Sequence, residues 1–140
     1  MRKEIFVLIL RLTLSGVFLY AGIIKAANPE KFWIDVQNYQ LLPHFGNVLV
    51  ALYLPYLEIL CALALWYPRW ALGSVSLMGG MMLVFTIALL SAWIRGLDIT
   101  CGCFGGSEKN RYIEWLVRDI LLILAIAWIG REDWSKMQSN

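Results

Sequence analysis

Long apolar runs, separated by short polar connections, dominate the pattern of this chain. They cover approximately residues 5–24, 48–66, 70–94 and 112–129. A helix needs about 20 apolar residues to cross a hydrocarbon core about 30 Å thick. Each run therefore predicts one membrane-spanning helix, and the short alternating segments of a membrane β-barrel are not seen. We expect an all-α integral membrane protein, a four-helix bundle that forms a single domain over residues 1–140.

The connection between the first two runs, residues 26–43, carries a weaker helical signal. Asn28 is a good N-cap residue and Pro29 suits the first helical position. Large apolar side chains then recur at helical spacing, at Phe32, Trp33, Val36 and Tyr39. This pattern predicts a short amphipathic helix that lies in the membrane interface and ends at Pro43. The alternative is a solvent-exposed loop.

Composition agrees with a membrane location. Apolar residues make up 60% of the chain, charged residues only 16%, and the mean hydropathy is +0.65. These values lie outside the range of soluble globular domains. The expected partner is the lipid bilayer, and we expect no nucleic-acid partner. The apolar run that follows Met1 is too long for a cleaved signal peptide, which favours an uncleaved first helix.

Ionisable residues inside the predicted spans are the first candidates for function, because an unpaired charge in hydrocarbon is costly. They are Arg11, Glu58, Arg118 and Asp119. We count residues inward from the end of each span that lies on the same side of the membrane as the chain termini. By this count all four residues lie at nearly the same depth in the membrane, within a few residues of each other. One interpretation is an interhelical clasp, in which Arg118 and Asp119, about 100° apart on their helix, do not pair with each other. The other is a pocket for the head group of a quinone, with Glu58, Arg118 or Asp119 relaying protons.

Two cysteines stand one glycine apart in the polar connection between the third and fourth runs. A ring closed by Cys101 and Cys103 over Gly102 should be strained, and a strained disulfide is easily exchanged. Nearby Lys109 and Arg111 favour the nucleophilic thiolate. The pair is therefore a candidate redox site. The alternatives are a metal site, for which the chain offers too few ligands, lipid attachment, and two inert thiols.

The third cysteine, Cys61, belongs to the opposite side of the predicted bilayer. The separation across the membrane far exceeds the reach of a disulfide. We expect Cys61 to be a packed thiol of the core.

Several stretches resemble a known family. The segment Arg11-Leu-Thr-Leu-Ser-Gly-Val-Phe-Leu-Tyr-Ala-Gly-Ile-Ile-Lys25, followed by Asn28-Pro-Glu-Lys-Phe32, is similar to the opening signature of DoxX-like membrane proteins. Leu54-Pro-Tyr-Leu-Glu58 and Cys101-Gly-Cys-Phe-Gly105 resemble its MauE branch, the methylamine-utilisation type. The resemblance covers nearly the whole chain.

This resemblance implies a four-helix protein of the bacterial cytoplasmic membrane that works with redox partners. MauE-like proteins are linked to maturation of a periplasmic dehydrogenase whose small subunit is rich in disulfides. Other DoxX-like proteins are tied to sulfur-compound oxidation with quinone as acceptor. Many members lack the cysteine pair, so a shared fold does not establish shared chemistry. The resemblance carries over Cys101 and Cys103 as the redox pair.

The orientation in the membrane follows from positive charges near the span ends. Their count in the connecting segments is balanced, but Arg2 and Lys3 precede the first span, which predicts cytoplasmic termini and a periplasmic cysteine loop. Our hypothesis is a membrane thiol:disulfide oxidoreductase that exchanges disulfides with a periplasmic thioredoxin-like or client protein. Electrons would pass to or from a quinone, with no covalent cofactor or metal. The alternative is a non-enzymatic assembly factor for a periplasmic redox enzyme, and a small-molecule transporter is a more distant third class.

Overall fold

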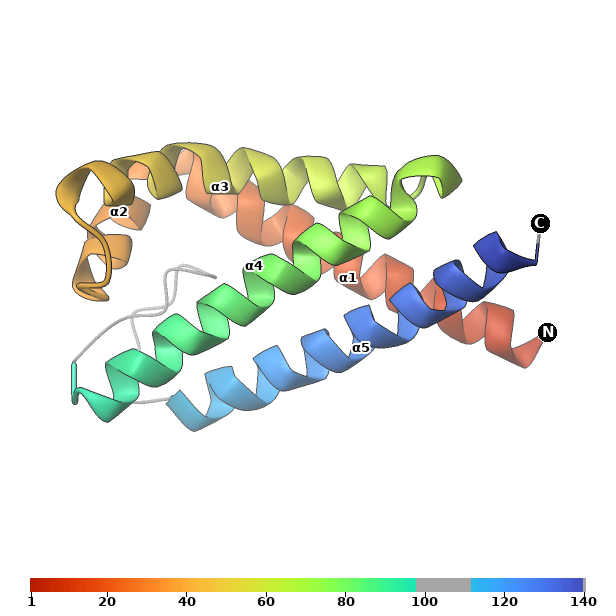
Figure 1. Ribbon diagram of the computed structural model, residues 1–140. Coiled ribbons are helices and arrows are strands. Elements are labelled where there is room, and N and C mark those ends of the chain that lie inside the picture. Colours follow the sequence, from red (N-terminus) through yellow and green to blue (C-terminus); the bar gives the residue numbers. More distant parts are fainter. Residues whose placement is uncertain (98–111, 140) are drawn as a thin grey trace.

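The computed structural model describes residues 1–97 and 112–139, and these residues form helices without any strand. The helices are α1 (Arg2–Ala27), α2 (Pro29–Asn38), α3 (His44–Ala64), α4 (Pro68–Ile94) and α5 (Tyr112–Gln138) (Figure 1). The all-α prediction is confirmed for the described part of the chain.

Three of the described helices, α1, α3 and α4, are long and apolar enough to cross a membrane. Their outward faces carry exposed apolar side chains, such as Val84 and Ile87 of α4, which lipid would cover. The chain is therefore a multi-pass membrane protein. Helix α5 is as long as α4 but carries Glu114, Arg118 and Asp119 in its first third, and it is not among the three. A fourth span at α5 stays a prediction.

The long helices run antiparallel to their neighbours in sequence. Both chain ends and the turn between α3 and α4 lie at one end of the molecule, which we call the termini end (Figure 1). Helix α2, the end of α4 and the start of α5 lie at the other, the α2 end (Figure 1). Helix α1 packs mainly along α3, and α4 packs along α5. Helices α3 and α4, joined by a short turn, also contact each other and run antiparallel (Figure 1).

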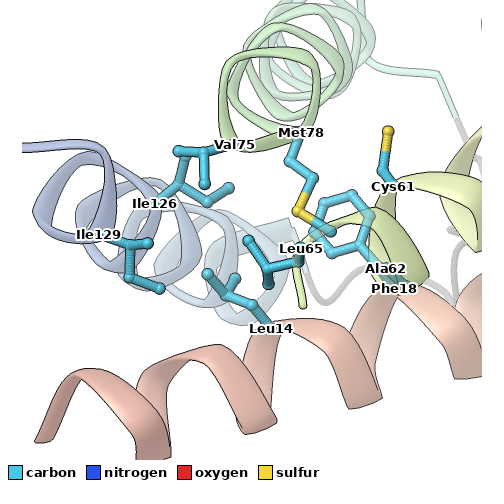
Figure 2. Close-up of a cluster of buried hydrophobic side chains, with 9 residues drawn as sticks. All are labelled: Leu14, Phe18, Cys61, Ala62, Leu65, Val75, Met78, Ile126 and Ile129. Atoms are coloured by element: carbon cyan, nitrogen blue, oxygen red, sulfur yellow. The ribbon is translucent and has the colours of Figure 1, made fainter. Parts of the chain in front are cut away.

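The core joins α1, α3, α4 and α5. Figure 2 shows its largest cluster of buried side chains, which includes Leu14, Leu65, Met78 and Ile129, each fully buried. Cys61 lies in the same cluster as a free, buried thiol, as predicted.

Helices α1 and α3 approach each other closely at Gly22. A Cβ atom added there would lie 2.7 Å from Cγ1 of Ile59 and 2.8 Å from the carbonyl oxygen of Pro55. Both distances are too short for any real side chain, so only glycine fits. This contact sets the spacing of α1 and α3 and brings the later residues of α1 against Glu58.

Helix α2 begins at Pro29, as predicted, with Asn28 at the N-cap position but without a side-chain capping bond. It ends at Asn38, earlier than expected, and Gln40 has a left-handed φ of 50° that interrupts the helix. Pro43 then serves as the N-cap of α3. The expected end at Pro43 was therefore wrong, although the amphipathic helix itself is present. Its position relative to a membrane interface stays a prediction.

Candidate functional site

A buried ion pair joins α1 to α3 near the α2 end. The Lys25 ammonium donates to Oε1 of Glu58 at 2.6 Å, and Lys25 is only 3% exposed. The same ammonium lies 5.1 Å from the centre of the Phe32 ring, a cation–π contact. Because a buried charge is costly without a partner, the pair favours the close packing of the two helices.

The sequence analysis did not assign Lys25 a partner, because Lys25 follows the first apolar run, which ends at Ile24. The helix continues to Ala27, so Lys25 stays in the last turn of α1 and faces the bundle. The following pair Ala26-Ala27, which favours helix, was the available signal.

A second ion pair belongs to α5 alone. Nε and Nη2 of Arg118 donate to Oδ1 of Asp119 at 3.1 and 2.8 Å. Asp119 is fully buried, whereas the Arg118 side chain is 29% exposed. The expectation that these neighbours do not pair was therefore wrong. Their Cα–Cβ bonds do diverge, but the long arginine side chain bends around the helix to reach the carboxylate.

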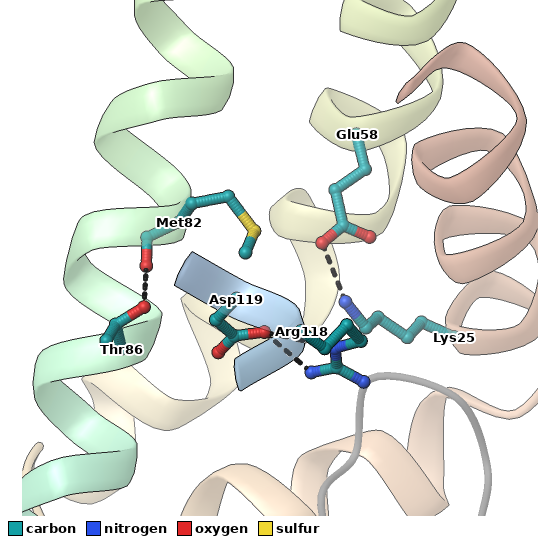
Figure 3. Close-up of polar contacts among 6 residues, drawn as sticks. All are labelled: Lys25, Glu58, Met82, Thr86, Arg118 and Asp119. Atoms are coloured by element: carbon teal, nitrogen blue, oxygen red, sulfur yellow. Dashed lines mark hydrogen bonds and ion pairs between the residues drawn. The ribbon is translucent and has the colours of Figure 1, made fainter. Parts of the chain in front are cut away.

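The two pairs line one cavity. Lys25, Glu58, Arg118 and Asp119 meet at a space of about 50 Å³, whose remaining walls are apolar side chains of α1, α3, α4 and α5. Figure 3 shows the two pairs side by side, with Met82 of α4 completing the wall. The four formal charges sum to zero. Such a site can orient hydrogen-bonding groups and hold protons without placing a net charge in the membrane.

Arg11, the remaining predicted member, lies elsewhere. It donates to the Leu65 carbonyl oxygen at 2.9 Å and also pairs with Asp133 of α5, at the termini end. Arg11 and Lys25 are 14 residues apart on α1, about 21 Å along the helix. The predicted set of four charges at one depth is thus divided into two sites. Both interhelical pairs, Lys25–Glu58 and Arg11–Asp133, act as clasps, through partners that the sequence analysis did not assign.

Cys101 and Cys103 lie outside the described residues, so their position and redox state stay predictions. The described residues on either side of this stretch make specific hydrogen bonds. The Tyr112 hydroxyl donates to the Leu97 carbonyl oxygen, and Nη1 of Arg95 donates to the Tyr39 carbonyl oxygen at 3.1 Å. These bonds fix the end of α4 to the start of α5 and to the end of α2.

Taken with its apolar outer surface, this arrangement defines a class: a multi-pass helical membrane protein with charged residues paired inside the bundle. A family model described as "Methylamine utilisation protein MauE" matches residues 3–131. The chain therefore belongs to the MauE family. No solved structure matches it.

Individual relatives agree with this assignment. The chain is 33% identical over 119 residues to the methylamine utilization protein MauE of Paracoccus denitrificans, covering 84% of this chain and 64% of the relative. It is 34% identical over 107 residues to that of Paracoccus versutus, covering 76% and 57%. For Methylorubrum extorquens the identity is 34% over 115 residues, covering 78% and 61%. The chain spans about three fifths of the length of these relatives. The MauE part of the resemblance is confirmed, and the wider DoxX-like relationship stays a prediction.

Proposed function

We propose that this protein is a membrane thiol:disulfide oxidoreductase of methylamine utilisation, which exchanges disulfides through Cys101 and Cys103 with a periplasmic thioredoxin-like or client protein. The observation that carries the proposal is the position of the pair in the chain. Cys101 follows Leu97 by four residues, and Leu97 is bonded to Tyr112 at the end of the molecule opposite the termini. Leu97 and Tyr112, the described residues on either side of the connection, therefore lie together at the α2 end of the helices.

The exchange conserves atoms and electrons. In the oxidising direction, a thiolate of the partner attacks one sulfur of the Cys101–Cys103 disulfide and releases the other cysteine as a thiolate. A second partner thiolate then attacks the mixed disulfide, which leaves the partner oxidised and both cysteines reduced. Two electrons have entered the cysteine pair. A membrane quinone would accept them together with two protons, and the reverse direction would use a quinol as the reductant.

A quinone head group would bind beside Arg118. An open groove of about 470 Å³ runs along α5. It is lined by Ile113, Val117, Leu121 and Leu122 and by the charged residues Glu114 and Arg118. Its size and apolar walls suit a quinone ring, and the guanidinium can donate to a ring carbonyl. Asp119, bonded to the same guanidinium, would supply or receive protons from the inner side. The inner cavity of about 50 Å³ is too small for the ring and belongs to the proton path.

We propose further that α5 is a fourth span and that both termini are cytoplasmic in a bacterial inner membrane. The complete burial of Asp119 supports a membrane-embedded α5. Lys25 is left out of the charge count because it is buried in the ion pair with Glu58. Five lysines and arginines then flank the spans at the termini end, and four flank them at the α2 end. They are Arg2, Lys3, Arg69, Arg131 and Lys136 against Lys31, Arg95, Lys109 and Arg111. This bias favours cytoplasmic termini.

Trapping of a mixed disulfide tests the exchange. In intact cells we expect Cys101→Ser or Cys103→Ser to accumulate a disulfide-linked adduct with a periplasmic protein, and the double variant to accumulate none. Absence of an adduct from both single variants, with the partner abundant, would exclude the mechanism.

Labelling with a membrane-impermeant thiol reagent tests the topology. We expect the loop cysteines to react from outside after mild reduction, while buried Cys61 stays unlabelled and serves as the internal control. Labelling that requires permeabilised cells would place the loop in the cytosol and contradict the proposal.

The second candidate function is a non-enzymatic maturation factor for a periplasmic redox enzyme such as methylamine dehydrogenase. The ion pairs Lys25–Glu58 and Arg11–Asp133 favour it. Each pair joins two helices, and this structural role explains the buried charges without any role in catalysis. Client maturation that survives in the Cys101→Ser/Cys103→Ser double variant would select this function. Loss of activity with retained folding in Asp119→Asn would instead favour the oxidoreductase.

A further inference from the structure

Glu58 and Asp119 line the charged cavity, and one buried carboxylate oxygen of each has no partner among the described residues. Oε2 of Glu58 and Oδ2 of Asp119 are inaccessible to solvent and accept no hydrogen bond from the described residues. Glu58 is 7% exposed and Asp119 is fully buried. Their other oxygens are bonded to Lys25 and Arg118. A buried acceptor left unsatisfied costs about 1–3 kcal/mol, so both atoms call for a donor.

The size, charge and chemistry of the site restrict what that donor can be. The cavity of about 50 Å³ exceeds the space that one water needs and is far smaller than a quinone ring. Each carboxylate already faces a cation, so a bound metal ion or ammonium would add a net charge inside the membrane. A quinone carbonyl is itself an acceptor. A small neutral donor satisfies all three conditions.

We propose that this cavity binds water that bridges Glu58 of α3 and Asp119 of α5, forming a proton-exchange site inside the bundle. When one carboxyl is protonated, the bridging water accepts that proton and passes one of its own to the other carboxylate. Lys25 and Arg118 each bond one oxygen of these carboxylates (Figure 3), which leaves the second oxygen of each for the water. This inference does not rest on the cysteine chemistry, and its tests need no redox activity.

Water-edited solid-state NMR of the full chain in lipid vesicles tests the proposal, with water itself as the probe. We expect the side-chain carboxyl carbons of Glu58 and Asp119 to receive magnetisation from water nearly as fast as exposed Glu4. The fully buried Met78 methyl provides the dry control. The Glu58→Gln and Asp119→Asn variants assign the two signals. Transfer to both carboxyl carbons as slow as to Met78 would overturn the proposal.

A cavity-filling substitution adds an independent measurement. Ala21 lines the cavity, so Ala21→Val would place two methyl groups into it, and Ala26→Val on the same helix outside the cavity is the matched control. If water bridges the carboxylates, Ala21→Val lowers the Tm relative to the control and slows magnetisation transfer to Asp119. A dry cavity would gain packing contacts, so a higher Tm with unchanged transfer would contradict the bridge.

Discussion

Replacement of Glu58 by Gln should destabilise the protein more than simultaneous replacement of Glu58 and Lys25. The single substitution leaves the Lys25 ammonium 3% exposed and without its counter-charge, close to the positive Arg118. Lys25→Met has the converse effect, because it leaves the Glu58 carboxylate buried without a cation. The double variant Lys25→Met/Glu58→Gln removes both charges, so no unpaired ion stays behind.

The magnitude follows from the geometry. Two unit charges 2.6 Å apart attract by about 6 kcal/mol at an effective dielectric constant of about 20. Desolvation of both ions offsets most of this attraction. Removal of one partner from a buried pair costs about 3–5 kcal/mol, whereas neutral replacement of both is often close to neutral. We therefore expect each single variant to lose about 3 kcal/mol and the double variant about 1–2 kcal/mol, which corresponds to a coupling energy of about 4–5 kcal/mol.

Reversible unfolding in lipid bicelles measures these differences as a double-mutant cycle. The matched control combines Glu58→Gln with Asp133→Asn, which disrupts the other clasp about 21 Å away along α1. Those two effects should add within about 0.5 kcal/mol. If the Lys25 and Glu58 substitutions are also additive, the pair does not hold α1 to α3 and our reasoning fails.

Three further substitutions test the packing by the same unfolding measurement. Gly22→Ala should cost about 1–3 kcal/mol, because the added Cβ would overlap Pro55 and Ile59. The control Gly16→Ala has open space around it and should be neutral or stabilising by up to about 1 kcal/mol. Equal effects of the two substitutions on stability would disprove the close contact at Gly22. Arg11→Met should cost about 3 kcal/mol by leaving the partly buried Asp133 without a cation, and no loss would show that this ion pair is dispensable. Tyr112→Phe should cost about 1 kcal/mol by removing the bond to the Leu97 carbonyl, and an unchanged stability would contradict that bond.

Local signals in the sequence predicted the helices well. Pro29 at the start of α2 matched the expected first helical position, and the apolar run 70–94 matched α4 at its end, Ile94. The predicted boundaries erred mainly where helices extend beyond the apolar run, as α5 does by continuing to Gln138. Hydropathy marks the part of a helix suited to hydrocarbon, whereas hydrogen bonding continues the helix past that limit. For this reason Asp133 was not recognised as a partner for Arg11.

The sequence was less informative about the candidate site. It singled out Glu58, Arg118 and Asp119, because charges in apolar runs are conspicuous, but it grouped Arg11 with them and left Lys25 out. Depth along a helix is readable from residue number, yet the direction in which a side chain faces depends on the neighbour it packs against. Gly22 illustrates this dependence, since its role became visible only with Pro55 and Ile59 beside it.

By itself, the sequence determined that this protein is helical, membrane-embedded and equipped with a closely spaced cysteine pair, because hydrophobic length and residue spacing are properties of a single segment. The tertiary structure decided which charges meet: Lys25 with Glu58, and Arg11 with Asp133. It also decided that Glu58 and Asp119 share one cavity. These outcomes depend on how antiparallel helices align and rotate against each other, and that alignment is set by packing between segments distant in the sequence.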